Sequence, residues 1–134
     1  MTHLPTVLII EDSTTQAKLT AGQLAQHAIN VIIAEDGLEG LRCVDQYRPD
    51  LVVLDINLPK MDGYQVCYRL KRDETTRDIP VIMLTDNDDS QNAFKGLEAG
   101  AVDYIPKDRF AIKHLLSTLQ MMGLLELEAE EEDL

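Results

Sequence analysis

Cysteine is scarce in this sequence, and its positions disfavour both disulfides and a thiolate metal site. Only Cys43 and Cys67 occur in 134 residues, and neither has a second cysteine or a histidine at a metal-ligand spacing. Both lie inside helical patterns, so they are predicted to be reduced thiols in the core or at its boundary. Reduced thiols are typical of a reducing compartment, and a cytoplasmic location is therefore expected.

Positive charge is also scarce, with 12 lysines and arginines against 24 aspartates and glutamates and a formal net charge of −12. Proteins that bind nucleic acid need a basic face for the phosphates, so no nucleic-acid partner is expected. Residues 126–134 carry part of the acidic excess. They are predicted to form a solvated or frayed tail after a domain over residues 1–125. A tail that docks specifically is the alternative.

Long hydrophobic runs are absent, since no apolar stretch approaches the ~20 residues of a membrane-spanning helix. No membrane partner is therefore predicted. Residues 1–6 also lack the basic and apolar regions of a signal peptide. Hydrophobic residues nevertheless make up 45% of the chain, which predicts a single domain with a sizeable core.

Four short apolar runs are present, and each ends in residues that carry chemistry. The run 7–10 precedes Glu11 and Asp12, the run 51–54 precedes Asp55, the run 81–84 precedes Thr85, and the run 102–106 precedes Lys107. Consecutive apolar residues of this length are typical of strands in a parallel sheet that is covered on both faces.

Strand and helix patterns alternate five times along the chain. Strands are predicted at 6–11, 30–34, 51–55, 80–84 and 102–106. Helices are predicted over 14–27, from 37 until Pro49 ends the helix, from 63 to 72, after a cap at Asp88 or Asp89, and over 109–122 before Gly123. The fourth helix is expected to turn Ala93, Leu97 and Ala101 inward. This βα order predicts an α/β fold with a parallel sheet and helices on both faces.

The carboxyl ends of parallel strands share one edge of the sheet, which is where open α/β sheets bind ligands. Three carboxylates, a hydroxyl and an ammonium are therefore expected to meet in one crevice. Carboxylates packed this closely repel one another and need a cation. Because the ligands are all oxygens, a hard ion such as Mg2+ is predicted.

The segments VLIIED, DLVVLDINLPKMDGYQ, IPVIMLTD and GAVDYIPK occur in this order, and with them the chain resembles the receiver domains of response regulators over about residues 5–122. The resemblance implies a flavodoxin-like five-stranded sheet of order 2-1-3-4-5. It also implies a role for each residue of the edge: Asp55 as phosphoacceptor, Glu11, Asp12, Asp55 and the backbone carbonyl of Asn57 as Mg2+ ligands, Lys107 and Thr85 as phosphoryl contacts, Thr85 and Tyr104 as the switch, and Asn57 and Asn87 beside the hydrolytic water.

By the same resemblance, the chain is predicted to be a single-domain response regulator of two-component signalling and not a turnover enzyme. It would take a phosphoryl group from a sensor histidine kinase or a phosphotransfer protein. Its output would be protein contact through the fourth helix, the strand 102–106 and the helix 109–122, with a homodimer as one possible partner. Leucines and methionines between 116 and 125 either pack on the body or supply that contact.

Two departures from the family's pattern bear on the site. The family usually has Lys-Pro where this chain has Lys107-Asp108, and the residue after Thr85 is usually small but is Asp86 here. One alternative is therefore a constitutive interaction module with the same fold and no switch. Another is a Mg2+-dependent phosphohydrolase with an Asp nucleophile, but Asn57 stands where such enzymes usually have an acid/base Asp.

Overall fold

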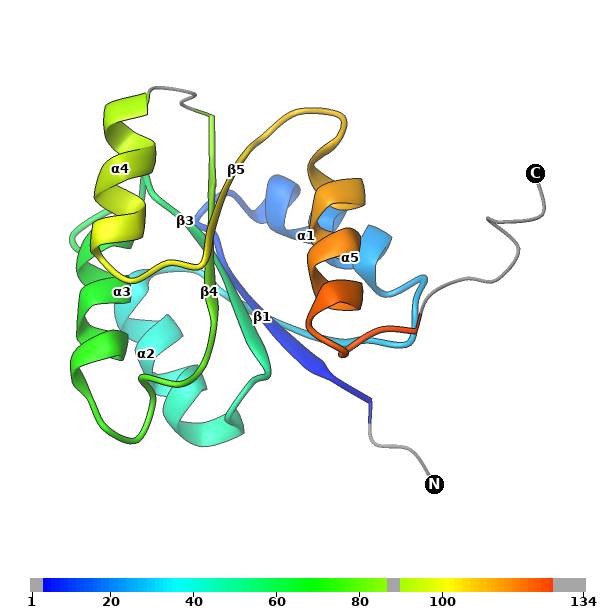
Figure 1. Cartoon of the computed structure of the whole chain (residues 1–134), viewed down its shortest axis with the longest axis horizontal. Coiled ribbons are helices and arrows are strands. Elements are labelled where there is room, and N and C mark those ends of the chain that lie inside the picture. Colours follow the sequence, from blue (N-terminus) through cyan, green and yellow to red (C-terminus); the bar gives the residue numbers. More distant parts are fainter. Residues whose placement is uncertain (1–3, 87–89, 127–134) are drawn as a thin grey trace.

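A computed structural model describes residues 4–86 and 90–126, with the side chains of all of these except 90–93. It contains one parallel sheet of order β2-β1-β3-β4-β5 (Figure 1). The strands are β1 (Thr6–Ile10), β2 (Asn30–Ala34), β3 (Leu51–Asp55), β4 (Val81–Thr85) and β5 (Asp103–Pro106). The helices are α1 (Thr14–Leu24), α2 (Gly37–Tyr47), α3 (Gly63–Arg72), α4 (Ser90–Glu98) and α5 (Ala111–Met121). The predicted flavodoxin-like order is confirmed.

Helices cover both faces of the sheet, with α1 and α5 on one face and α2, α3 and α4 on the other (Figure 1). Alternate residues of each strand enter two separate apolar clusters. Leu54 of β3, for example, packs with Val66 of α3, whereas its neighbour Val53 packs with Leu115 of α5. Every residue of β3 and β4 is buried, which explains why their sequences are apolar without alternation.

Side chains at the helix starts explain where several helices begin. The hydroxyl oxygen of Ser13 accepts from the backbone N–H of Gln16 at the start of α1. Asp62 and Gln65 form a reciprocal capping box at the start of α3. Gly123 follows α5 with a φ of 79°, as expected of a glycine that ends a helix. Helix α1 ends at Leu24, three residues before the predicted end.

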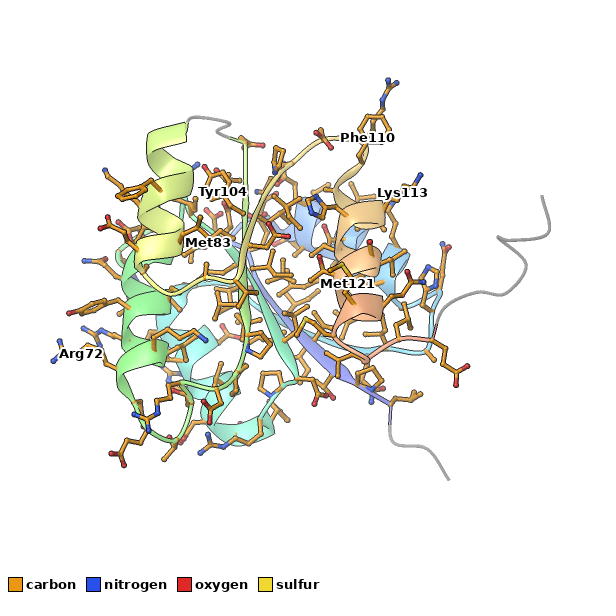
Figure 2. The ribbon with its side chains drawn as sticks, in the orientation of Figure 1. Arg72, Met83, Tyr104, Phe110, Lys113 and Met121 are labelled. Carbon is orange, nitrogen blue, oxygen red and sulfur yellow. The ribbon has the colours of Figure 1, made fainter. Side chains whose placement is uncertain are left out.

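The inward face of α4 differs from the prediction. Leu97 was predicted to face the core, but its side chain is 53% exposed. Gly96 faces the sheet instead, since a Cβ built on it would lie 3.2 Å from the Tyr104 ring and 3.3 Å from Met83 (Figure 2). The close approach through glycine turns Leu97 to the outside. Ala101 is buried as predicted, but it follows the helix and is not part of it.

Both cysteines are free thiols, Cys67 in the core and Cys43 at its boundary, as predicted. Burial raises the pKa of the Cys67 thiol to about 11, so this thiol is protonated at neutral pH. Over residues 4–86 and 90–126, no helix is long and apolar enough to cross a membrane. Asn87, the predicted caps Asp88 and Asp89, and the tail after Glu126 lie outside the described residues.

Candidate functional site at the carboxyl edge of the sheet

Three neighbouring strands bring the predicted site residues to one edge. Glu11 directly follows β1, Asp55 ends β3 and Thr85 ends β4. The strand order reverses between β1 and β3, and this is the point at which sheets of this kind bind ligands. These three side chains meet because β1 pairs with β3 and β3 pairs with β4, all in parallel. The resemblance had predicted this strand order.

Glu11, Asp12 and Asp55 form a compact acidic cluster. One carboxylate oxygen from each residue lies within 4.8 Å of the others. Glu11 and Asp55 are each only 5% exposed, whereas Asp12 is exposed to solvent. Two buried carboxylates with a third at the mouth form an oxygen-only site that is open on one side, which is the donor set that hard divalent ions prefer.

Lys107 reaches this cluster from the end of β5. Its Nζ donates to Glu11 Oε1 at 2.6 Å and to Gln16 Oε1 at 2.8 Å, and it lies 3.2 Å from Asp55 Oδ2. An ammonium has three donor hydrogens, so these acceptors use all of them. The Lys107 side chain is 13% exposed, and its charge partly compensates the buried carboxylates.

Burial and neighbouring charges shift the pKa values of two groups in the site, Glu11 and Lys107. Burial raises the pKa of Glu11, and the neighbouring Asp55 raises it further while Lys107 opposes both. Burial lowers the pKa of Lys107, but the hydrogen bond to Glu11 and the charge of Asp55 outweigh it, so the pKa ends above its ordinary value. Lys107 is therefore charged at neutral pH. Three carboxyl groups surround this single ammonium, so the donor set still suits a cation.

Gln16 is the member of this site that sequence reasoning missed. It lies in the first turn of α1, and 91 residues separate it from Lys107. A signal was present, because the first turn of a helix that follows a strand lies above the same edge of the sheet. Amides are common in helix first turns, however, and nothing in the sequence distinguishes this one.

The two predicted switch residues lie one strand apart. Thr85 is fully buried at the end of β4, and its carbonyl accepts from the backbone N–H of Lys107 at 2.6 Å. Tyr104 on β5 is half-buried against the core cluster under α4, beside Met83 (Figure 2). The Tyr104 ring therefore lies between the strand that ends in Thr85 and the helix that follows it.

Asp108 shapes the loop after Lys107. Among the described residues every peptide bond is trans, including the one before Asp108. The Asp108 carboxylate accepts from the backbone N–H of Phe110 at 2.8 Å, and its carbonyl accepts from Ala111 at the start of α5. Phe110, the N-cap residue of α5, has no side-chain cap bond of its own. Where the family usually has proline, this chain therefore has an aspartate whose two hydrogen bonds stabilise the turn that leads into α5.

Two hydrogen bonds and a close approach at a glycine fix the turn after Asp55. Asn57 donates its backbone N–H to Asp55 Oδ1 at 3.2 Å, and Gly63 donates its own to the Ile56 carbonyl. A Cβ on Gly63 would lie 2.6 Å from the Asp55 carbonyl oxygen and 2.8 Å from the Ile56 Cα. Only glycine allows α3 to begin this close to the strand that carries Asp55.

A hollow of about 520 Å³ opens beside the cluster. Asp12, Asn57 and Thr85 line it, together with residues of the turn before α3. Asp86 is exposed directly after Thr85. The acidic cluster is therefore accessible from solvent through this hollow. The Asp86 carboxylate adds a further negative group directly after β4.

The family of the chain follows from comparison with known proteins. The model of the response regulator receiver domain matches residues 7–120. The chain belongs to this family, and it is a receiver domain of the two-component response regulator type.

Individual relatives agree with the family match. RpaA of Synechocystis, a DNA-binding dual master transcriptional regulator, is 40% identical over 119 residues, which cover 89% of this chain and 49% of RpaA. The chain spans about half the length of the curated relatives it matches. The structure of the chemotaxis protein CheY4 of Vibrio cholerae is similar with a TM-score of 0.81 and 27% identity, covering 89% of this chain and 98% of that one. The Mn2+-bound form of response regulator Rcp1 is similar with a TM-score of 0.76 and 26% identity, covering 92% and 97%.

Proposed function

We propose that this chain accepts a phosphoryl group on Asp55 and transmits that event by protein contact. The observation that carries the proposal is the position of Lys107, whose ammonium lies 3.2 Å from Asp55 Oδ2 and contacts Glu11 of the acidic cluster. A cation beside a buried carboxylate in an opening to solvent is the arrangement that phosphoryl transfer to an aspartate needs, because that reaction depends on positioning and charge neutralisation.

The chemistry is an in-line displacement at phosphorus. A carboxylate oxygen of Asp55 attacks the phosphorus of a phosphohistidine, a new O–P bond forms and the P–N bond breaks. The electron pair of that bond stays on the imidazole, which takes up a proton from solvent. Lys107 balances charge on the transferred oxygens, and the buried Thr85 hydroxyl is a further donor at the next strand end. The proposed donor is a sensor histidine kinase or a phosphotransfer protein. The chain would take part in its own phosphorylation and dephosphorylation without being a turnover enzyme.

Glu11, Asp12 and Asp55 fit a divalent cation, and we propose Mg2+. The fit rests on three carboxylates that each place an oxygen within 4.8 Å of the others. The pKa of Glu11 is raised, first by burial and then by the neighbouring Asp55, and a bound cation would favour its charged form. The similar Rcp1 structure holds Mn2+, an ion that also accepts oxygen ligands. Resemblance adds the Asn57 backbone carbonyl to the ligand set. A bound Mg2+ would neutralise charge on the phosphoryl oxygens.

The proposed readout runs through Thr85 and Tyr104 to the surface made by α4, β5 and α5, called here the output face. Several apolar side chains on or beside these elements are more than half exposed: Phe94, Leu97, Val102, Phe110 and Met121. A phosphoryl group that draws the Thr85 hydroxyl would change the packing of Tyr104 under α4 and thereby this surface. The downstream partner is a protein or a second copy of the chain.

The proposal is tested by labelling with a small phosphodonor such as acetyl phosphate, with Mg2+ and with a chelator. We expect one acid-labile phosphoryl group on the wild-type protein, and none on Asp55→Asn. The matched control is Asp45→Asn, since the Asp45 side chain on α2 is 79% exposed and far from the site in the fold. Labelling of Asp55→Asn at the wild-type level would show that another residue is the acceptor.

The same experiment decides the main alternative. A constitutive module with the receiver fold would stay unlabelled with every donor and would bind its partner equally with or without a phosphodonor. The trans loop at Lys107 does not favour that alternative, because it still delivers the ammonium to Asp55.

A further inference from the structure

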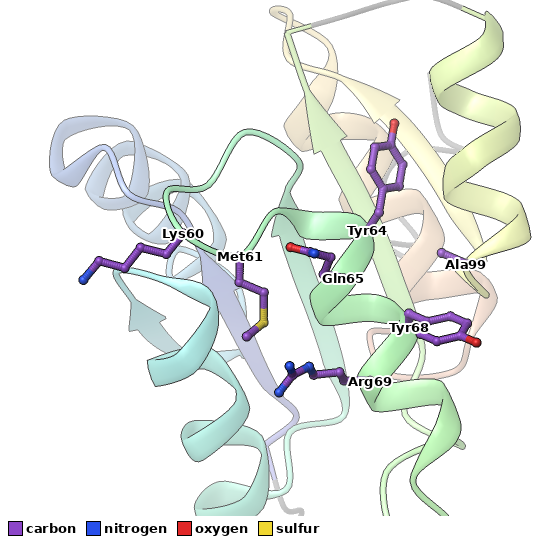
Figure 3. Close-up of a pocket in the computed structure, with 7 residues that line it drawn as sticks. All are labelled: Lys60, Met61, Tyr64, Gln65, Tyr68, Arg69 and Ala99. Atoms are coloured by element: carbon purple, nitrogen blue, oxygen red, sulfur yellow. The ribbon is translucent and has the colours of Figure 1, made fainter.

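A groove crosses the outer surface of α3, away from the acidic cluster (Figure 3). It has a volume of about 490 Å³. The groove is lined by Lys60 and Met61 of the loop before α3, by Tyr64, Gln65, Tyr68 and Arg69 of the helix, and by Ala99 after α4. Its surface thus combines two cations with aromatic rings and the apolar side chain of Met61.

The charge of this surface is opposite to that of the chain. Between residues 60 and 72 there are four cations and one carboxylate, in a protein of formal net charge −12. That carboxylate, Asp62, accepts a hydrogen bond from Gln65 in the cap of α3. The groove lining itself contains two cations and no carboxylate, although Asp73 and Glu74 follow directly after α3.

Two of the four cations have other partners, and two are available. Lys71 Nζ donates to the carbonyls of Arg77 and Ile79, and the Arg72 guanidinium lies 5.2 Å from the centroid of the Tyr68 ring. Lys60 and Arg69 are exposed, and neither forms an ion pair with a carboxylate in residues 4–86 and 90–126. Both residues line the groove with Met61, and the Lys60 side chain extends away from Met61 and Arg69 (Figure 3).

We propose that the α3 groove binds the acidic segment 126–134 of a second copy of this chain. That segment has six side-chain carboxylates in nine residues, with Leu127 as its second residue and Leu134 as its last. Carboxylates suit Lys60 and Arg69, and a leucine suits the exposed Tyr68 ring and Met61. Charge complementarity therefore selects this segment as the occupant from among the sequences present in the molecule.

The fold favours the segment of another molecule. Helix α5, which precedes the segment, covers the face of the sheet opposite to α3 (Figure 1). The nine residues of the segment reach at most ~32 Å when fully extended, and residues that bind the groove cannot also span the distance to it. A path around the edge must pass a sheet and two helix layers, each about 10–12 Å thick. A second copy meets no such limit, so the contact depends on protein concentration.

The test measures binding of a fluorescein-labelled peptide of residues 126–134 to the full chain by fluorescence anisotropy. The groove variant is Lys60→Glu/Arg69→Glu. Its matched control, Lys18→Glu/Lys113→Glu, makes the same change in net charge at exposed residues of α1 and α5. Thermal melting of both variants reports that they are folded, and a peptide with all six carboxylates replaced by amides tests the role of charge.

We expect saturable binding to wild type and to the control, and binding about tenfold weaker to the groove variant, since two exposed ion pairs become repulsive. The amide peptide should bind the wild-type protein about as weakly as the acidic peptide binds the groove variant. Higher salt should weaken the binding of the acidic peptide to wild type. Equal binding to the folded groove variant and the control would overturn the proposal, as would equal binding of the amide peptide or no binding to wild type. Asp55 labelling is independent of all these outcomes.

Discussion

In the described residues of the site, one ammonium is shared among three acceptors. Lys107 is held by Glu11, Gln16 and Asp55, and only Gln16 among these is uncharged. A divalent cation on the carboxylates would compete with Lys107 for their oxygens, whereas the amide of Gln16 would remain an acceptor. On the proposed function, we infer that Gln16 is a positioning residue that would keep the ammonium beside a phosphoryl group on Asp55.

Replacing Gln16 with methionine removes the acceptor and retains the length of the side chain. We expect the initial rate of Asp55 labelling to fall about threefold to tenfold, because a partly exposed hydrogen bond to a charged group is lost. Gln16→Glu keeps an acceptor oxygen and should label faster than Gln16→Met at the same pH. The backbone N–H of residue 16 stays bonded to Ser13 in both variants, so melting temperatures should change little. Wild-type labelling kinetics in Gln16→Met would contradict this role.

At the scale of the elements, close approaches through glycine position the site. Gly40 lets α2 lie on β1, since a Cβ there would overlap the Ile10 side chain. Gly63 lets α3 begin against the end of β3, where the neighbours are backbone atoms that cannot rotate away. The distance between α3 and Asp55 is thus set by the absence of a side chain.

Gly63→Ala is expected to destabilise the fold by about 1–3 kcal/mol, because the new methyl group overlaps backbone atoms of Asp55 and Ile56. Gly22→Ala is the matched control. Gly22 lies inside α1 with nothing within 4 Å of its Cβ position, so alanine there should stabilise by about 0.5–1 kcal/mol through helix propensity. Urea denaturation of the two variants measures both effects. Equal effects of the same sign would show that the contact at Gly63 does not control stability.

At the scale of the whole molecule, the distribution of charge and apolar surface separates three regions. The carboxyl edge is acidic, the α3 groove is basic and the output face is apolar. For the leucines and methionines between 116 and 125, packing on the body and exposure for contact were both left open, and four of them pack on the body. Leu119 is buried, and Leu116, Leu124 and Leu125 pack against the α1–α5 cluster. Met121 is the most exposed of the group at 85%.

Mg2+ should stabilise the whole fold, because it binds the folded acidic cluster and not the unfolded chain. We expect millimolar Mg2+ to raise the melting temperature by the equivalent of ~1–3 kcal/mol. Asp12→Ala should reduce this gain and should not lower stability without the metal, since it removes one repelling carboxylate. Asp45→Ala should keep the full gain. If Mg2+ leaves the melting temperature of the wild-type protein unchanged, the cluster does not bind the ion.

Met121→Glu is expected to weaken self-association of the beryllofluoride-treated protein about tenfold, because it places a charge in the apolar output face. Leu38→Glu is the matched control, since Leu38 is 54% exposed on α2, away from that face. Leu124→Glu is less informative, because Leu124 packs on the core and its loss would also affect folding. Sedimentation velocity measures association, and Asp55 labelling should be unchanged. Equal dimerisation of wild type and Met121→Glu would exclude this face.

The amino-acid sequence by itself determined the strands and the residues at their ends. Strand identity follows from short apolar runs, and all five were predicted within one residue at each end. Because parallel strands end on one edge, the sequence also predicted that five side chains approach one another there: Glu11, Asp12, Asp55, Thr85 and Lys107. The order of the strands in the sheet was predicted from the resemblance to receiver domains. These features depend on local periodicity and on one rule of topology.

Only the tertiary structure decided which side chains complete the site and which face outward. Gln16 meets Lys107 across 91 residues, a contact that no local pattern encodes. Leu97 faces solvent because Gly96 lies against Tyr104, so the rotation of α4 depends on a neighbouring strand. Helical spacing defines a stripe of residues to within about one position, but close packing against other elements selects the residue that faces the core.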